Sequence, residues 1–229
     1  MSWDPVWENI FQQREAWGLY PPEELIRFVA QHYFRVPDRK QVWMLEVGCG
    51  PGAGPSWFMA REGFCFTGVD GSTTAIEKAR RRFKAEDLPG DFRVGFLDDL
   101  PWEDETFDCI VDVASLQCND EAATERIVAE IGRLLKPGGR HFSLTAKAGS
   151  WGDGAGERID RTSFRNVTEG PFSGMGVMRF ATRESLEALY ADFSFLTFEY
   201  SLRSFENGNR ELGNWVVCCQ KQFGSRDEL

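Results

Sequence analysis

The chain of 229 residues predicts an α/β fold, in which a doubly wound, mostly parallel sheet has helices on both faces and ends in an antiparallel hairpin. Short β-branched or apolar runs alternate with longer segments of helical periodicity, which is typical of parallel strands joined by crossover helices. A glycine-rich turn at 48–54 stands directly after one of the apolar runs. Near the C-terminus, two alternating runs flank Asn207-Gly208, a strong signal for a hairpin.

The expected strands are five runs of apolar and β-branched residues followed by the two alternating runs of the hairpin. Each expected strand has turn-forming residues at its ends. We expect strands over 42–47, 64–69, 92–97, 107–113 and 139–146, and then near 193–203 and 213–222.

Capping residues mark the starts of the helices. Thr74 and Glu77 have the spacing of a capping box, so a helix of about ten residues is expected there. The segment 119–121, Asn-Asp-Glu, places caps and acids at the start of another helix, and the segment 136–139, Lys-Pro-Gly-Gly, ends it. Pro21-Pro22 opens an earlier helix. A last helix is expected from Thr182 to about Tyr190.

We expect a single domain, 1–229, because roughly 150 residues per domain is the usual scale. The interpretation assigns a helical cap to 1–38, the core to 40–146, a lid loop to 147–180, and a C-terminal helix and hairpin to 181–222. Within the lid, Gly149 to Gly176 is too polar and too rich in glycine for a regular element. A loop of this length inside a compact domain is typically a lid or a binding loop.

Charge and hydropathy exclude several classes of protein. The chain carries 26 Lys and Arg against 36 Asp and Glu, a formal net charge of −10. This balance disfavours a nucleic-acid partner, because phosphate neutralisation needs a basic surface. No apolar run approaches the roughly 18 residues of a membrane span, and the N-terminus lacks the order of a signal peptide. We therefore expect a cytoplasmic protein without membrane association.

Its six cysteines show no CxxC or CxxH spacing, so we expect buried reduced thiols and no metal site.

The segment that carries chemistry is Leu45-Glu46-Val47-Gly48-Cys49-Gly50-Pro51-Gly52-Ala53-Gly54, at a strand-to-helix turn. Glycines there let the backbone turn tightly and approach a ligand at the carboxyl edge of the sheet. Asp70 follows about twenty residues later, at the end of the next expected strand, where a carboxylate accepts hydrogen bonds from both ribose hydroxyls. An adenosine-containing ligand is therefore favoured. The glycines also satisfy a relaxed dinucleotide fingerprint, so this motif alone leaves a nicotinamide cofactor open.

Four spaced motifs together resemble class I S-adenosylmethionine-dependent methyltransferases. They are the glycine segment 46–52, then Val-Asp-Gly-Ser at 69–72, Leu-Pro-Trp-Glu-Asp-Glu-Thr-Phe-Asp at 100–108, and Leu-Leu-Lys-Pro-Gly-Gly at 134–139. The resemblance implies a Rossmann-like seven-stranded sheet with the last strand antiparallel, and S-adenosyl-L-methionine across the tips of strands one, two and four. A dinucleotide is disfavoured, because Glu46 adds negative charge near the loop and Pro51 removes an amide donor.

The resemblance also implies cofactor contacts residue by residue. The glycine loop should surround the methionine and ribose, Asp70 should hold the ribose, and Val113 should lie under the cofactor. Many relatives have Gly-Asp before the Leu-Pro pair, whereas here Phe96 follows Gly95. The adenine contact then falls to Leu97, to Asp98, or to Phe96 turned inward. Together with two aromatic residues discussed next, the expected cofactor-binding residues are Glu46, Gly48, Cys49, Gly50, Gly52, Asp70, Gly71, Ser72, Leu97, Asp98, Val113, Trp17 and Tyr20.

An aromatic-rich segment leads into the chain. It contains Trp3, Trp7, Phe11, Trp17 and Tyr20. So many large apolar groups must pack against something, and packing on the sheet is one alternative. The other, which we favour, is that Trp17 and Tyr20 close over the cofactor or the acceptor. The resemblance places Gln117 and Cys118 on the acceptor side.

No catalytic base stands out. His141 begins an expected strand at the edge of the sheet away from the ligand site, so a structural role is favoured, and His32 is expected to pack against its helix neighbours. Asp160 or Glu169 in the lid are candidates to deprotonate an acceptor, and four arginines are candidates to hold an anionic one. A solvated charged loop is the simpler interpretation. The four arginines are Arg158, Arg161, Arg165 and Arg179.

The sequence therefore predicts an enzyme, an S-adenosylmethionine-dependent methyltransferase that acts by in-line transfer on an oxygen or nitrogen of a small-molecule acceptor. The protein would supply position and desolvation, and the cofactor the reactive group. The alternative is a non-catalytic cofactor-binding or scaffold protein on the same fold. The acceptor and the oligomeric state are not predicted.

Overall fold

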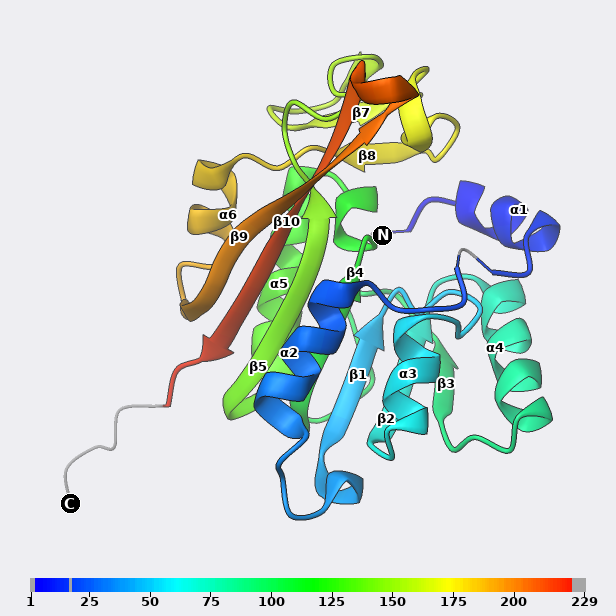
Figure 1. The fold of residues 1–229 in the computed structure, drawn as a ribbon, viewed down its shortest axis with the longest axis vertical. Helices are drawn as coiled ribbons and strands as arrows, with labels where there is room; N and C mark the ends of the chain where they lie inside the picture. The colour runs from blue at the N-terminus through cyan, green and yellow to red at the C-terminus, as the bar shows by residue number, and fades with distance from the viewer. Residues whose placement is uncertain (1–2, 17, 224–229) are drawn as a thin grey trace.

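The computed structural model describes residues 3–16 and 18–223, and a seven-stranded sheet forms its centre (Figure 1). Across the sheet the strands lie in the order β3 (Asp91–Val94), β2 (Cys65–Asp70), β1 (Trp43–Val47), β4 (Phe107–Val113), β5 (Leu135–Ala146), β10 (Arg210–Lys221) and β9 (Phe193–Phe205). The first five are parallel, and β10 runs antiparallel to both β5 and β9. The predicted Rossmann-like sheet, mostly parallel with the last strand antiparallel, is confirmed.

Helices cover both faces of this sheet. They are α1 (Val6–Gln13), α2 (Glu23–Tyr33), α3 (Pro55–Arg61), α4 (Thr73–Ala85), α5 (Glu121–Leu134) and α6 (Arg183–Leu189). One face packs against α2, α3 and α4, which bury Phe28, Met59 and Ile76, and the other against α5 and α6, which bury Ile127 and Leu186. In Figure 1, α2 and α3 lie in front of the sheet and α5 lies behind it. Across the described ranges, no helix is long and apolar enough to cross a bilayer.

Two strand boundaries differ from the prediction. β3 ends at Val94, because the chain then turns back and the Asp99 N–H donates to the Phe96 carbonyl at 3.2 Å. β5 begins at Leu135, directly after α5. The segment 136–139 therefore ends the helix as expected but lies inside the strand, where the register with β4 shifts between Phe107 and Cys109.

The cap of α4 also differs from the prediction. Ser72 is the N-cap, and its hydroxyl accepts the Ala75 N–H at 3.0 Å. Thr74 instead donates its hydroxyl to Glu8 of α1. The helix begins immediately after β2 because a serine at that point already offers a capping oxygen. The caps of the later helices agree with the prediction, with Asp120 at α5 and Thr182 at α6.

The expectation that Gly149 to Gly176 has no regular element was wrong. This part of the chain folds with the residues that follow it into a small antiparallel sheet of β6 (Glu157–Arg158), β7 (Ser163–Arg165) and β8 (Val177–Arg179), and it includes the turn η3 (Gly170–Phe172). Buried aromatic and aliphatic side chains such as Phe164, Phe172 and Met178 hold it together. Strands of two or three residues are too short for periodicity to reveal. In Figure 1 the small sheet lies beyond the carboxyl ends of the parallel strands, beside the tip of the β9–β10 hairpin.

A buried carboxylate fastens the turn that follows β4. Asp112 accepts the backbone N–H groups of Ser115 at 2.9 Å and Leu116 at 3.0 Å, and the Ser143 hydroxyl at 2.6 Å. These bonds hold the turn η2 (Leu116–Cys118) against β5. Asp112 thus sets the position of residues at the carboxyl edge of the sheet.

Replacing Asp112 with alanine should lower the free energy of unfolding by about 3 kcal/mol, because buried donors lose their acceptor. Urea unfolding measures the change. Asp104→Ala is the matched control, since its side chain is 73% exposed and pairs with Arg133 only at the surface. The control should change the same quantity by less than about 1 kcal/mol. Equal effects of the two substitutions would contradict the structural role of Asp112.

Candidate active site

The turn after β1 passes through four glycines with left-handed backbone conformation. Gly48, Gly50, Gly52 and Gly54 have φ values of 68°, 51°, 66° and 60°. At Gly48 a side chain is also excluded by space, because a Cβ there would overlap the Cβ of Ser115. Glycine therefore allows the ends of β1 and β4 to lie close together.

Asp70 ends β2 and joins this turn to the next one. Its Oδ2 accepts the Gly50 N–H at 2.9 Å, and its Oδ1 accepts the Ser72 N–H at 2.8 Å. Burial raises the pKa of the Asp70 carboxyl to about 6, although both hydrogen bonds favour the charged form. A carboxylate oxygen that accepts one bond keeps capacity for another donor. Asp70 can therefore hold the turn and bind a ligand hydroxyl at the same time.

Glu46 and Cys49 complete the inside of the turn. Glu46 accepts the hydroxyl of Ser56 in the first turn of α3. Burial raises the pKa of Glu46 well above its usual range, with the Ser56 hydrogen bond opposing the shift. Burial likewise raises the pKa of the Cys49 thiol. A thiol of raised pKa is a poor nucleophile at neutral pH, so Cys49 is suited to packing.

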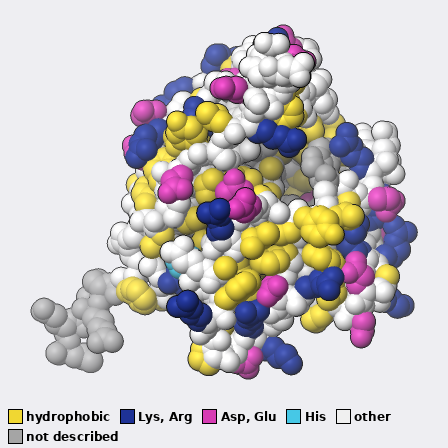
Figure 2. Space-filling view, viewed as in Figure 1, with side chains coloured by type: hydrophobic (Ala, Val, Ile, Leu, Met, Phe, Trp, Pro, Cys, Tyr) yellow, Lys and Arg dark blue, Asp and Glu magenta, His cyan; other side chains and the backbone are white. Residues whose placement is uncertain are grey.

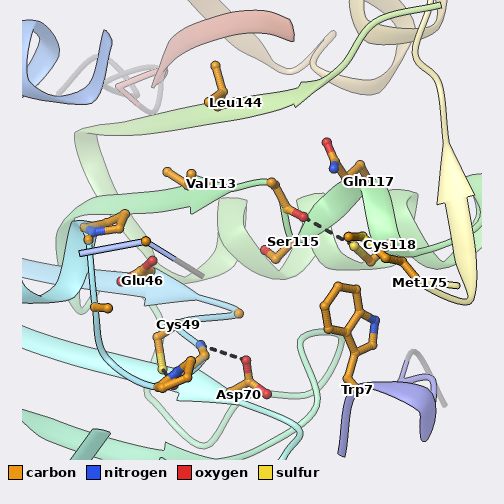
Figure 3. A pocket seen from close by; sticks show the side chains of 18 of the residues that line it. Trp7, Glu46, Cys49, Asp70, Val113, Ser115, Gln117, Cys118, Leu144 and Met175 are labelled. Atoms are coloured by element: carbon orange, nitrogen blue, oxygen red, sulfur yellow. Dashed lines mark hydrogen bonds between the residues drawn. The ribbon is translucent and has the colours of Figure 1, made fainter. Parts of the chain in front are cut away.

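A cavity of about 570 Å³ opens over the carboxyl ends of the parallel strands, within the range of roughly 300–1,000 Å³ typical of small-molecule sites. Figure 3 shows its side chains in sheet order, from Leu144 on β5 through Val113 on β4 and Glu46 on β1 to Asp70 on β2. Figure 2 shows the surface hollowed above a band of hydrophobic side chains. Strand order reverses between β1 and β4, the place where open α/β sheets bind ligands.

The N-terminal segment forms the wall opposite the sheet. Trp3, Trp7 and Phe11 lie four residues apart and all line the cavity. Figure 3 shows Trp7 reaching from α1 into the cavity. The Trp3 indole packs over Gly71, where a Cβ would overlap its ring. Its ring centroid lies 6.5 Å from that of Phe96, which also lines the cavity.

Polar contacts tie this segment to the start of α4. Glu8 accepts the hydroxyls of Ser72, at 2.6 Å, and of Thr74. The ammonium group of Lys78 donates to the carbonyls of Phe11 at 2.7 Å and Arg14 at 2.9 Å. These contacts, which we call the α1 latch, hold the aromatic wall over the β2 side of the cavity.

The end of the cavity over β4 and β5 is mostly apolar. Figure 3 shows Met175 beside Cys118 at this end. Side chains from the sheet and from the segment before β8 line it together with β10. They include Val113, Leu144, Pro171, Phe172, Met175 and Leu212.

Two residues of η2 border this apolar end. The Gln117 amide oxygen accepts the Ala146 N–H at 2.7 Å, and the Cys118 thiol donates to the Ala114 carbonyl at 3.3 Å. Burial raises the pKa of Cys118. Both side chains line the cavity, so they can shape it, but their polar atoms already hold the backbone.

Nine of the expected cofactor-binding residues line the cavity, namely Glu46, Gly48, Cys49, Gly50, Asp70, Gly71, Leu97, Val113 and Tyr20. Three do not. Gly52 packs against Ala79 of α4, Ser72 caps α4, and Asp98 pairs with Arg126 at 3.3 Å. Trp17 lies outside the described residues.

Tyr20 lines the cavity mouth rather than its interior. The residue is 77% exposed, and its ring meets Trp57 edge-on with centroids 5.8 Å apart. The aromatic wall is instead formed by Trp3, Trp7 and Phe11. Trp7 and Phe11 lie four residues apart on one side of α1, whereas Trp3 precedes the helix.

The charged residues considered for the acceptor lie elsewhere. Arg158, Arg161, Arg165 and Arg179, which were candidates to hold an anionic acceptor, do not line this cavity. Asp160 and Glu169 do not line it either, and Asp160 accepts the backbone N–H of Glu121 at 2.9 Å.

Neither histidine lines this cavity. His141 is buried, with Nδ1 3.0 Å from the Ile110 carbonyl and Nε2 3.2 Å from the Tyr190 hydroxyl, as a structural histidine should be. Burial lowers its pKa. His32 packs beside Phe28, with ring centroids 5.0 Å apart, as expected.

Sequence reasoning missed Asp4, a carboxylate in the lining of the cavity beside Gly176. Its Oδ1 accepts the Val6 N–H at 3.0 Å at the start of α1. A Cβ on Gly176 would overlap its carboxylate, so Asp4 lies where the N-terminal segment meets the small sheet. An acid just before a helical run is the signal that could have found it.

The charge of the lining suits a cationic ligand. Among the described residues, the lining holds three carboxyl groups, Asp4, Glu46 and Asp70, and no Lys, Arg or His. A sulfonium and an ammonium group would gain from carboxylates, whereas a pyrophosphate would find no cation. The residues present therefore fit S-adenosylmethionine and do not fit a dinucleotide.

The fold and this cavity are similar to those of class I S-adenosylmethionine-dependent methyltransferases. More particularly, residues 44–139 match the family model described as methyltransferase domain. The match begins in β1 and ends inside β5, so it contains the glycine turn and Asp70. S-adenosylmethionine is the cofactor of this class.

Relatives and solved structures agree with this assignment. The chain is 38% identical over 98 residues to phthiotriol/phenolphthiotriol dimycocerosates methyltransferase 1 of Mycobacterium ulcerans, covering 42% of this chain and 34% of that protein. It is 34% identical over 130 residues to a fatty-acid O-methyltransferase of Mycolicibacterium smegmatis, covering 55% and 46%. The chain thus spans less than half the length of these curated relatives. The crystal structure of a SAM-dependent methyltransferase from Methanosarcina mazei superposes with a TM-score of 0.69 at 25% identity, covering 84% of this chain and 97% of that one.

Gly48→Ala should lower the free energy of unfolding by about 3 kcal/mol, because the new Cβ overlaps Ser115 and also favours a different φ. Gly63→Ala is the control, since Gly63 has a φ of 85° but no atom within 4 Å of the position of a Cβ. It should lower the same quantity by only about 1 kcal/mol. Thermal unfolding followed by circular dichroism compares the two. Similar losses would show that the two turns are not in close contact.

Proposed function

We propose that the chain transfers a methyl group from S-adenosylmethionine to an oxygen or nitrogen of an apolar small-molecule acceptor. The observation that carries the proposal is the two-part cavity. An acidic end at Asp70 and Glu46 runs without interruption into an apolar end at Leu144, Phe172 and Met175. The first suits a cationic cofactor, and the second suits an apolar acceptor.

In this proposal the cofactor lies along the carboxyl edge of the sheet. Gly48 and Gly50 contact its amino-acid and ribose portions through their backbone, and the Asp70 carboxylate accepts the ribose hydroxyls. Trp3 and Phe96, tilted at 48° to one another, lie at the Gly71 end of the cavity, where they cover the adenine. Stacking on aromatic rings replaces the acidic contact that many relatives have in the segment after β3.

The acceptor occupies the apolar end. Two relatives, a phthiotriol/phenolphthiotriol dimycocerosates methyltransferase and a fatty-acid O-methyltransferase, are named for lipid acceptors. The aliphatic and aromatic lining supports an apolar acceptor here as well. A carboxylate acceptor is disfavoured, since the described lining offers it no cationic side chain and three carboxyl groups.

The residues of the chain act by position and desolvation. When bound, the cofactor supplies a methyl group whose bond to sulfur breaks as the bond to the acceptor forms, with the electron pair remaining on sulfur. Val113 and Leu144 place the acceptor on the side of the cofactor away from Asp70, which suits in-line transfer. Trp7 excludes water from the space between the two ligands. Asp4 is the carboxylate positioned to take the proton that the acceptor releases.

We propose a cytoplasmic location for this reaction. All six cysteines are free, and four of them are buried. Free thiols in this number favour a reducing compartment.

The affinity for S-adenosylmethionine should fall about tenfold between pH 7 and pH 5, because the Asp70 carboxyl, with a pKa of about 6, takes up a proton over this range. The protonated form accepts ribose hydroxyls poorly, so binding is strongest above pH 6 and lost below it. Isothermal titration at several pH values measures the profile.

Asp70→Asn should bind the cofactor about tenfold more weakly at pH 7 and without this pH dependence. Asp98→Asn is the matched control, because Asp98 does not line the cavity, and it should keep native affinity and profile. No binding by the native protein would refute the proposal. A native profile in Asp70→Asn would refute the role of Asp70.

Methyl transfer from labelled cofactor should favour dodecanol or dodecylamine over dodecanoate by about tenfold in kcat/KM. Leu212→Glu, which adds a charge to the apolar end, should reduce transfer by at least about tenfold and leave cofactor binding intact. Leu202→Glu on the exposed side of β9 should change neither. Preference for dodecanoate would contradict the predicted acceptor class, and tight cofactor binding without transfer to any apolar acceptor would favour a scaffold protein.

A further inference from the structure

A second cavity, of about 500 Å³, lies between α5 and α6. Figure 1 shows α5 behind the main sheet, on the face opposite α2 and α3. The two cavities share no lining residue, so this one is separate from the site of methyl transfer. Nothing in the proposed reaction uses it.

Arg179 of β8 is the distinctive side chain in this cavity. The residue is 3% exposed, and in the described part of the chain neither its Nε nor its Nη2 has a hydrogen-bond partner. Burial of a guanidinium without a partner is costly, so structures normally pair it. Burial lowers the pKa of Arg179, in keeping with a charge that lacks compensation.

Carboxylates near Arg179 are engaged elsewhere. Asp112 accepts donors of η2 and β5, and Asp160 accepts the Glu121 N–H at 2.9 Å. Glu121 itself pairs with Arg161. Arg179 lines the cavity, and an anion is the partner that would compensate its buried charge.

The remaining lining defines which anion fits. Aliphatic and aromatic side chains from both helices and from the start of β9 line the cavity. Arg161 and Lys221 also line it, but they pair with Glu121 and Glu105. Glu125 and Asp192 add negative charge. The acidic residues oppose a dianion such as phosphate, whereas one carboxylate balances one guanidinium. An apolar tail would cover the apolar lining, which consists of Val128, Ala129, Ala188, Leu189 and Phe193.

We infer that this cavity is a binding site for a small monocarboxylate with an apolar tail, which pairs with the charge of Arg179. The site does not depend on the proposed methyl transfer. It would bind its ligand equally in a protein that transfers no methyl group.

Isothermal titration with hexanoate tests the inference, with hexanamide as the neutral analogue of the same shape. The native protein should bind hexanoate at least about tenfold more tightly than hexanamide or inorganic phosphate. Arg179→Met should abolish this preference. Arg165→Met, in the exposed position of the neighbouring strand β7, should keep it.

A second variant guards against a folding defect. Ala129 is exposed on α5 and lines the cavity, so Ala129→Trp fills the space without disturbing the core. It should also lose hexanoate binding. Arg179→Met should unfold at a temperature no lower than the native protein, because the substitution removes an unpartnered buried charge.

Three results would overturn the inference. The first is hexanoate binding that survives both Arg179→Met and Ala129→Trp, and the second is phosphate binding tighter than hexanoate binding. The third is a native protein that binds no hexanoate, and a lower melting temperature for Arg179→Met would then make Arg179 purely structural. Because hexanoate binding is measured without S-adenosylmethionine, these outcomes are independent of whether methyl transfer occurs.

Discussion

The contact between the Asp70 carboxylate and the Gly50 amide is the interaction on which the rest of the site depends. It joins the turn after β1 to the end of β2, and a second bond from the same carboxylate sets Ser72 as the cap of α4. The position of α4 in turn fixes the polar groups that hold α1. One buried carboxylate therefore orders the sheet edge, the glycine turn and the N-terminal wall.

Burial makes the charged form of Asp70 costly. Desolvation penalises the charged form of Asp70, and two backbone donors compensate for only part of that penalty. A bound hydroxyl or a nearby positive charge would supply more. The same reasoning applies to Glu46, whose burial beside the turn disfavours its charge. A bound cation that carries hydroxyl groups would therefore stabilise the charged forms of Asp70 and Glu46.

Much of the fold could be predicted from the sequence, because parallel strands and their helices repeat over enough residues to show a period. The runs at 42–47 and 107–113 were placed to within a residue. Short elements escaped, since β6 and β7 are shorter than any period and Phe96 turns where an extended strand was expected. In the site, the glycine turn and Asp70 could be placed because backbone conformation and strand ends depend on local sequence. The aromatic wall and Asp4 could not, because their position depends on long-range contacts of α1 with α4 and with the small sheet.

The α1 latch bears on how ligands enter and leave the cavity. It consists of hydroxyl, carboxylate, ammonium and carbonyl groups near the surface, for which water competes, rather than of interlocked apolar side chains. Opening of the wall would break these polar contacts and the packing of Phe11 and Trp3, but not the packing beneath the sheet. Entry and release of ligands would therefore depend on the contacts between the N-terminal segment and α4, and not on the stability of the core. The same contacts would set how long a ligand remains bound.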